Sequence, residues 1–382
     1  MSFGIFRAPT RIVAGSGSLA ELGAELNALP GPTVVVADAG LAEVGVLPEI
    51  LRGVPADRIG ATVLVAPDPD IAAVEAATTT ARRASCRSVL AIGGGSGLGA
   101  AKAVAILLAN VGPLLDYEGD GRVPHPAAPT VAVPTTAGSG SEVSNALVLH
   151  EPGREREIII RGPGCEPRTA VLDATVLRGL PRTPMLYAGL DALTHALESL
   201  WARGATVFTE ALAVRAAREI IATLPSAVAG CRGSGDGPNA TGANDTVLQR
   251  LLEASTAANL ACGNSGLGLV HALSSSVQVP LAHGLQNGVL LPRVAELNRG
   301  TVSAEAAELI DRLPQLYEEL SFRPVFDNAV IGAAELDSMV AASGGHPFRA
   351  NNRREVTDRD LHGLLAAAVE APGAPLTEED PI

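Results

Sequence analysis

The sequence predicts an α/β N-terminal domain built on a parallel sheet, followed by an all-helical C-terminal domain. Up to about residue 180, short apolar segments alternate with amphipathic ones, and this alternation is typical of strand–helix–strand units in a parallel sheet. From about Thr183 the strand-like segments stop and only helical periodicity remains. With 382 residues, the chain is also longer than one hydrophobic core usually supports. We therefore predict one domain over residues 1–181 and a second over residues 182–382.

Three segments of the first domain have the composition of buried strands, because they are almost continuously apolar. This is expected of parallel strands, since helices cover both faces of such a sheet. The strands with their exit loops are Thr33–Ala37 with Asp38, Arg87–Ile92 with Gly93-Gly94-Gly95-Ser96, and Thr130–Val133 with the loop Pro134–Glu142. Helices are predicted between them over Ile71–Ala84 and Gly99–Leu108.

The second domain is predicted to consist of helices, with one turn-rich connector and a loose acidic tail. The connector, Gly230–Asp245, is rich in Gly, Asn and Asp, and the tail covers Gly373–Ile382. The predicted helices are Met185–Trp201, Val207–Leu224, Val247–Ala261, Gly266–Ser276, Glu305–Leu320 and Asp358–Glu370.

Charge and composition exclude several classes of partner. A formal net charge of −13 argues against nucleic acid and against an anionic membrane surface. No apolar run reaches the roughly 18 residues of a membrane-spanning helix, and the first residues lack the features of a signal peptide. The four cysteines have no paired spacing, which is typical of reduced thiols. We therefore expect a cytoplasmic protein.

Asp191 and His195 are candidates for metal ligands. They lie four residues apart in a segment with helical leucine spacing, so a carboxylate and an imidazole share one helical face. Such a pair is half of a divalent-metal site, although an ordinary polar helix face would look the same. His271 and His283 downstream favour the metal site, because the chain has only seven histidines.

The exit loops of the predicted strands are suited to a dinucleotide. Gly93-Gly94-Gly95-Ser96 precedes a helix that contains Lys102, and glycines before a helix N-terminus let backbone N–H groups approach a diphosphate. A tight strand-to-helix turn would have the same composition, and the Gly-x-Gly-x-x-Gly pattern is absent. Asp38 can accept hydrogen bonds from a ribose diol and would repel a 2′-phosphate, which favours NAD over NADP.

Together these motifs resemble the iron-containing (group III) alcohol dehydrogenases. The resemblance runs from Arg11-Ile-Val-Ala-Gly-Ser-Gly to Ala282-His-Gly-Leu-Gln-Asn-Gly. It implies a Rossmann-like, dehydroquinate synthase-like nucleotide-binding domain joined to a helical metal domain. It also implies NAD and Fe²⁺, or Zn²⁺, as cofactors. The implied metal ligands are Asp191, His195, His271 and His283, and the implied cofactor contacts are Asp38, Gly94, Gly95, Ser96, Lys102, Thr135, Thr136 and Ser139.

Several positions depart from the family pattern. Gly99 stands where the family usually has Asp, and in this, together with Lys102, the chain resembles the maleylacetate reductase branch. Ser275 stands where many members have a histidine implicated in proton relay, and a hydroxyl cannot act as a base near neutral pH. Asp68 replaces a common Asn. Proton transfer is therefore expected to rely on water, the cofactor ribose or another group. Ser275 stays a candidate catalytic residue, because a hydroxyl can pass a proton along a chain.

The predicted function is the interconversion of a small alcohol and its aldehyde or ketone by hydride transfer, with a metal that polarises the substrate oxygen. Ser274–Ser276 and Cys262 favour a functionalised or carboxylated carbonyl substrate. The alternatives are maleylacetate reductase-type activity, a lyase related to dehydroquinate synthase, and a degenerate relative without catalysis. We also predict a homodimer.

Overall fold

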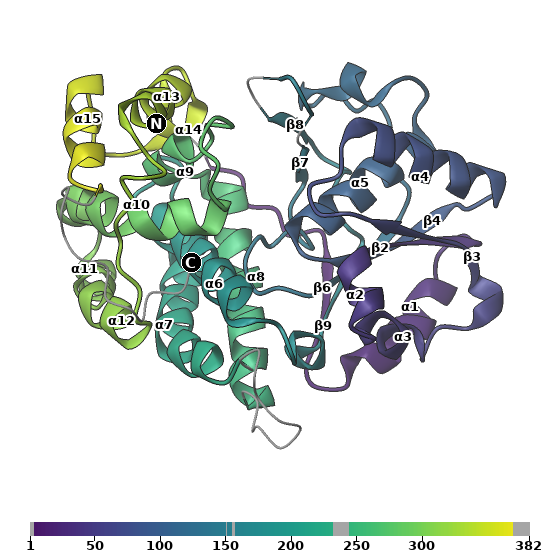
Figure 1. The fold of residues 1–382 in the computed structure, drawn as a ribbon. Helices are drawn as coiled ribbons and strands as arrows, with labels where there is room; N and C mark the ends of the chain where they lie inside the picture. The colour runs from purple at the N-terminus through teal and green to yellow at the C-terminus, as the bar shows by residue number, and fades with distance from the viewer. Residues whose placement is uncertain (1–3, 150, 155–156, 232–243, 370–382) are drawn as a thin grey trace.

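The computed structural model describes residues 4–149, 151–154, 157–231 and 244–369. A half containing the strands lies beside a half made of helices (Figure 1). The first contains a six-stranded sheet, and the second begins with helix α6 (Arg182–Leu200). The predicted fold class is therefore confirmed.

The main sheet is parallel throughout, with the order β1-β9-β6-β4-β2-β3. All three predicted strands are present in it, and β2, β4 and β6 are neighbours. Their carboxyl ends consequently meet at one edge of the sheet, where ligands of α/β proteins usually bind. The strands are β1 (Arg11–Ala14), β2 (Thr33–Asp38), β3 (Ile59–Val65), β4 (Ser88–Gly93), β6 (Thr130–Pro134) and β9 (Thr169–Leu172).

Helices cover both faces of this sheet, as the apolar strands predict. Val34 and Val36 of β2 belong to one buried cluster together with the helices α4 and α5, whereas Val35 and Ala37 belong to the other. This division follows from the alternation of side chains along a strand. The helices and short helical turns of this half are η1 (Ser18–Glu21), α1 (Leu22–Asn27), α2 (Ala39–Glu43), α3 (Val46–Leu51), η2 (Ala56–Arg58), α4 (Ile71–Arg83), α5 (Gly95–Ala109), η3 (Leu114–Tyr117) and η4 (Ala174–Leu177).

A small second sheet was not predicted. It has the order β5-β8-β7 and packs against α5. Its strands are β5 (Gly119–Asp120), β7 (Ala146–Leu149) and β8 (Ile158–Arg161), and β7 and β8 pair in antiparallel register. Strands of two to four residues carry too little periodicity to be recognised from sequence.

The helical half packs mainly around α6, which contacts α7, α8 and α10. Its core is continuous with one face of the main sheet, since Val171 and Leu190 belong to the same buried cluster. The division into two domains at residue 181 therefore stays a prediction, although α6 begins at Arg182. The remaining helices are α7 (Val207–Ala229), α8 (Asp245–Ser265), α9 (Leu269–Leu273), α10 (His283–Asn298), η5 (Arg299–Thr301), α11 (Ala304–Asp311), α12 (Leu313–Glu319), α13 (Ala333–Ser343), α14 (Pro347–Asn351) and α15 (Asp358–Ala366).

Two predicted helices differ most clearly from the observed ones, because one is shortened at both ends and the other is divided. The segment Gly266–Ser276 is helical only over α9, because Gly266 has a φ of 74° that a helix cannot accommodate. The segment Glu305–Leu320 divides at Arg312 into α11 and α12, just before Pro314, whose ring lacks a backbone N–H. The predicted tail and most of the predicted connector lie outside the described residues. Among the described helices, none combines the length and apolar character needed to cross a membrane.

Candidate metal centre and cofactor loops

The four predicted metal ligands lie together in the helical half. Asp191 and His195 belong to the buried middle of α6, His271 lies in α9, and His283 is the first residue of α10. The Nε2 atoms of the three imidazoles all approach one atom, Oδ1 of Asp191. The distances are 3.7 Å from His195, 3.5 Å from His271 and 3.7 Å from His283.

These distances fit a divalent ion shared by Asp191, His195 and His271, whose ligand atoms all lie within 4.8 Å of one another, whereas His283 lies outside this group. Two ligand atoms that each lie about 2.1 Å from a tetrahedrally coordinated ion are separated by about 3.4 Å. A hydrogen bond would be shorter than the 3.5 to 3.7 Å found here. Asp191, His195 and His271 are buried, whereas the side chain of His283 is 48% exposed. Solvent therefore reaches the cluster at His283, whereas the other three residues are shielded from it.

The charges in this cluster favour a ligand carboxylate and a neutral imidazole. Burial raises the pKa of Asp191, but the three histidines outweigh it and hold the pKa below its ordinary range. Burial lowers the pKa of His195 to about 4. For His271 burial also lowers the pKa, but the carboxylates of Asp191 and Glu198 outweigh this and raise it to about 9, so His271 would lose a proton when a metal ion binds near neutral pH. His195 consequently has a free lone pair near neutral pH, as a metal ligand requires.

Two further residues of the cluster were not predicted as functional. Glu198 is fully buried and lies 2.7 Å from Nδ1 of His271. It follows Asp191 by seven residues on α6, so its helical spacing could have indicated it. Asn287 of α10 donates from Nδ2 to Oδ1 of Asp191 at 2.8 Å. It follows His283 by four residues, which is again the spacing of one helical face.

The predicted cofactor loops meet at the carboxyl ends of β2, β4 and β6. Asp38 ends β2, and its Oδ2 accepts a hydrogen bond from the backbone N–H of Gly94 at 2.8 Å. Burial raises the pKa of Asp38, and the nearby charge of Asp68 raises it further. A Cβ on Gly97 would collide with the Asp38 carboxylate, so only glycine permits this close approach. Asp38 is therefore half-buried against the glycine-rich loop.

The loop after β6 lies against the glycine-rich loop. Thr136 would contact a Cβ on Gly94 at 3.4 Å, and Ser139 would lie 3.0 Å from a Cβ on Gly95. The backbone N–H of Thr135 donates to the carbonyl of Gly93 at 3.0 Å. The two loops form a continuous surface in which Gly94 and Gly95 carry no side chains, which is the kind of cradle that a diphosphate requires.

Ser96 and Lys102 have partners within the protein. The hydroxyl of Ser96 donates to Oδ1 of Asp68 at 2.6 Å. The ammonium group of Lys102 is buried and donates to the carbonyls of Ser141, Ser144 and Ala146. This placement argues against the predicted contact between Lys102 and a cofactor. The sequence placed Lys102 on the correct helix but could not show that its side chain faces the interior.

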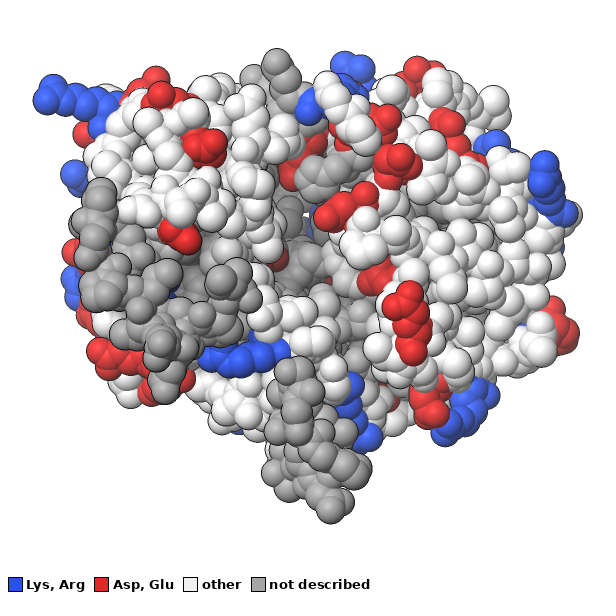
Figure 2. All heavy atoms as spheres, in the orientation of Figure 1, with Lys and Arg blue, Asp and Glu red and all other residues white. Residues whose placement is uncertain are grey.

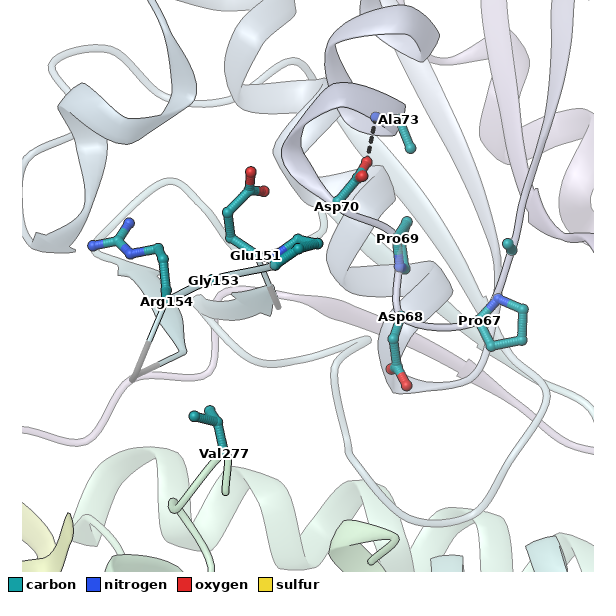
Figure 3. A pocket seen from close by; sticks show the side chains of 11 residues that line it. Pro67, Asp68, Pro69, Asp70, Ala73, Glu151, Gly153, Arg154 and Val277 are labelled. Carbon is teal, nitrogen blue, oxygen red and sulfur yellow. Dashed lines mark hydrogen bonds between the residues drawn. The ribbon is translucent and has the colours of Figure 1, made fainter. Parts of the chain in front are cut away.

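A pocket of about 600 Å³ opens between the two halves (Figure 3). On the sheet side it is lined by Asp68, Asp70, Glu151 and Arg154, and on the helical side by Val277. Figure 2 shows a hollow between the halves, with Asp and Glu side chains beside it on the sheet side. The pocket therefore extends from Asp68, which accepts a hydrogen bond from Ser96 of the glycine-rich loop, to Val277 in the segment that follows α9.

Ser275 lies two residues before Val277, in the turn after α9. Its hydroxyl is partly buried and donates to the carbonyl of Ala272 at 2.8 Å. The neighbouring Ser274 is buried, and its hydroxyl has no hydrogen-bond partner among the described residues. A hydroxyl that already donates to the backbone can still accept a hydrogen bond. Ser275 is therefore able to take part in a proton chain without being its base.

Two family profiles match the chain, one over most of the sheet half and one over the first part of the helical half. Residues 9–174 match the profile described as iron-containing alcohol dehydrogenase, and residues 185–304 match the C-terminal domain of the same family. The chain belongs to the iron-containing alcohol dehydrogenase family. The family and the enzyme class predicted from the sequence, an alcohol dehydrogenase-type oxidoreductase, are thereby confirmed.

Curated relatives agree with this membership. The chain is 35% identical to the probable alcohol dehydrogenase EutG of Salmonella typhimurium, over 70% of this chain and 66% of that protein. It is 31% identical to the NAD-dependent methanol dehydrogenase of Bacillus methanolicus, over 71% of this chain and 69% of that protein. The chain thus spans about two thirds of the length of these relatives.

Solved structures of the family have the same fold. The sulfoacetaldehyde reductase of Bifidobacterium kashiwanohense, solved with NAD⁺, superposes with a TM-score of 0.85 at 25% identity. The alignment covers 96% of this chain and 99% of that one. A 1,3-propanediol oxidoreductase superposes with a TM-score of 0.86 at 24% identity, over 96% of this chain and all of that one.

Proposed function

We propose that this iron-type dehydrogenase interconverts a small alcohol and its aldehyde or ketone, using NAD(H) and one divalent metal ion. The observation that carries the proposal is the approach of three imidazole Nε2 atoms to one carboxylate oxygen, at 3.5 to 3.7 Å. Cofactor loops at the sheet edge and the pocket between the halves support it. Family membership gives no support to the lyase alternative, and four intact ligand types argue against a degenerate relative.

The metal would be held by Asp191, His195, His271 and His283. A bound Fe²⁺ or Zn²⁺ supplies a Lewis acid that polarises the substrate oxygen, and bound NAD supplies or accepts the hydride. His283 is the half-exposed member of the set, so substrate would approach from its side. The buried Asp191 and His195 would hold the opposite side of the site free of bulk water.

The cofactor is proposed to be NAD rather than NADP. Asp38 lies at the end of β2 beside the glycine-rich loop, and the Asp68 carboxylate lies close enough to raise its pKa. A 2′-phosphate in this region would bring further negative charge to two carboxylates. The NAD-bound sulfoacetaldehyde reductase and the NAD-dependent methanol dehydrogenase are related proteins that support the same choice.

The substrate is proposed to be a functionalised but uncharged carbonyl compound. Three carboxylates line the pocket, namely Asp68, Asp70 and Glu151. The positively charged residue of the lining, Arg154, forms an ion pair with Glu118 at 3.0 Å, so its charge is already balanced. A negative potential of this kind opposes the entry of anions. The lining includes none of the four proposed metal ligands, so the pocket would act as an entrance to the site. As an entrance it would favour a neutral substrate over a carboxylated one and disfavour maleylacetate reductase-type activity.

A panel of carbonyl compounds tests this function. Protein reconstituted with Fe²⁺ without oxygen would be assayed by NADH oxidation, with metal analysis alongside. The matched pair glycolaldehyde and glyoxylate differ in carrying a hydroxymethyl or a carboxylate group. We expect kcat/KM to be at least about tenfold higher for the neutral member, because each like charge nearby costs of order 1 kcal/mol. If the metal-loaded protein fails to oxidise NADH with every carbonyl compound of the panel, the result would instead support the degenerate alternative.

A homodimer and a cytoplasmic location remain proposals. Ile5, Phe6, Val207 and Phe208 are exposed apolar residues, and the rings of Phe6 and Phe208 lie 5.8 Å apart. A clustered apolar surface of this kind is typical of contact with another protein, here a second copy of the chain. All four cysteines are free, as expected in a reducing compartment. Light scattering and cell fractionation test these two proposals.

A further inference from the structure

We propose that Glu198 is a positioning residue of the metal site, which sets the tautomer and the orientation of His271 through one buried carboxylate. This inference rests on the proposed metal site and adds a residue outside the ligand set. Glu198 lies on α6, seven residues after Asp191 and three after His195. One rigid helix would therefore carry two ligands and the support for a third.

Within the described part of the chain, Glu198 has three hydrogen-bond partners, and all of them come from one short segment. Its Oε2 accepts from the backbone N–H of Gly268 at 3.0 Å, and its Oε1 accepts from the N–H of Val270 at 2.6 Å. The third partner is Nδ1 of His271, 2.7 Å from Oε2. Glu198 has no solvent exposure. A buried carboxylate requires such partners, because an unpaired charge in the interior is strongly unfavourable.

The bond to the imidazole selects one tautomer. An ionised carboxylate can only accept hydrogen bonds, so Nδ1 of His271 must carry the proton. Nε2 is then the ring nitrogen left to face a metal ion, and this atom lies 3.5 Å from Oδ1 of Asp191 and 3.3 Å from Nδ2 of Asn287. A carboxylate behind a ligand histidine orients the ring and increases its basicity toward the metal. The geometry around His271 has all the elements of this arrangement.

The two backbone bonds hold α9 itself. This helix has five residues and follows Gly266 and Gly268, and a helix this short is unstable in isolation. Its first N–H groups have no partner within the helix, and Glu198 accepts from Val270 and from Gly268 just before it. A Cβ on Gly268 would lie 2.9 Å from Oε1 of Glu198, so glycine permits the approach. One carboxylate thus fixes both the backbone and the ring of His271.

Zinc binding by the full chain tests the inference through the variants Glu198→Gln and Glu198→Asp. The glutamine amide can still accept from backbone N–H groups, but its NH₂ group cannot accept from Nδ1. The aspartate keeps the charge on a shorter side chain. Thr223→Ala is the matched control, because Thr223 is also buried and, among the described residues, its hydroxyl bonds within its own helix, to the carbonyl of Glu219 at 2.7 Å.

Two readouts other than activity are measured on each protein. The dissociation constant for Zn²⁺ comes from competition with a chelator, and the low-field Nδ1–H resonance of His271 comes from NMR of the zinc-loaded protein. Circular dichroism verifies folding. We expect Glu198→Gln to weaken zinc binding by about 10- to 100-fold and to shift or remove the resonance. The zinc affinity of Glu198→Asp should lie between those of Glu198→Gln and the wild type. Thr223→Ala should match the wild type in zinc affinity and in the Nδ1–H resonance.

The outcomes separate this inference from the proposed metal site. If the wild type binds zinc and both folded Glu198 variants retain its affinity and its Nδ1–H resonance, the role of Glu198 is wrong while the metal site stands. If the wild type itself binds no zinc, the metal site is wrong. Should Glu198→Gln not fold, an unchanged affinity and resonance in Glu198→Asp would overturn the inference on its own.

Discussion

The metal cluster and the cofactor loops use their polar side chains in opposite ways. In the cluster, the Nε2 atoms of the three histidines lie near Oδ1 of Asp191 at distances too long for hydrogen bonds to it. The Asn287 amide lies within hydrogen-bond distance of the ligand atoms of Asp191, His271 and His283. In the loops, Asp38 and Ser96 direct their polar atoms toward other groups of the protein. The first site would bind through side chains. In the second, side chains shape a backbone that would bind the cofactor.

This difference makes the two regions respond differently to substitution. A side-chain ligand cannot be replaced by a neighbour, whereas a loop held by several hydrogen bonds loses only part of its support with each change. Variants in the cluster should therefore remove a function, and variants around the loops should alter stability or preference.

The largest expected effect comes from His271→Ala. Loss of one ligand in four should remove most bound metal and lower turnover at least about a thousandfold, since a Lewis acid contributes several kcal/mol and each 1.4 kcal/mol is about tenfold in rate. Metal content and NADH oxidation measure both. The exposed His125 offers a matched control, and His125→Ala should behave as wild type. Full metal content in His271→Ala would refute the ligand assignment.

A large loss of stability is expected from Lys102→Met. Lys102 is the one lysine of the sequence, and burial lowers its pKa to about 7. Its removal would leave three carbonyls without their donor and take away the positive charge near the buried Glu142, at a cost of about 3 kcal/mol in the free energy of unfolding. Urea unfolding measures this.

The variant Lys102→Arg further tests whether Lys102 supports the fold or contacts the cofactor. A planar guanidinium cannot reproduce the contacts of a compact ammonium group, so this variant should also be destabilised, by more than about 1 kcal/mol. If both variants keep wild-type stability but lose affinity for NADH, Lys102 acts on the cofactor, as the sequence first suggested.

A moderate change in cofactor preference is expected from Asp38→Gly. The ratio of kcat/KM for NADH to that for NADPH should fall by about tenfold, equivalent to about 1.4 kcal/mol, because a charge that repels the 2′-phosphate is removed. The ratio is the proper readout, since loss of the bond to Gly94 should weaken both cofactors. Asp57 is exposed in η2, and Asp57→Gly should leave the ratio unchanged. An unchanged ratio in Asp38→Gly would exclude the ribose role.

The smallest effect is expected from Ser275→His. A histidine here would add a group with an ordinary pKa of about 6.5 to the proton path. The pH–rate profile should gain an inflection near this pH, with a change in maximal rate below about tenfold. Identical profiles would show that protons do not pass this position.

The cluster was more predictable from sequence than the loops, for a physical reason. Asp191 and His195 share a helical face at any depth in the protein, so residue type and spacing sufficed. Glu198 was missed because a glutamate at helical spacing is usually a surface residue, and only the buried position of α9 gives it a partner. Asp38 and Lys102 depend on which groups surround a strand exit or a helix face, and this is decided by packing between segments far apart in the chain.

X-ray absorption spectroscopy of the zinc-loaded protein tests the central claim most directly. We predict one zinc per chain, with a first shell of three imidazole nitrogens and one carboxylate oxygen at about 2.0 to 2.2 Å, and any further ligand from solvent. A spectrum that requires three imidazole ligands would support binding of the ion by His195, His271 and His283, together with Asp191. A shell of oxygen ligands alone, or zinc bound at less than about a tenth of an equivalent, would contradict the account.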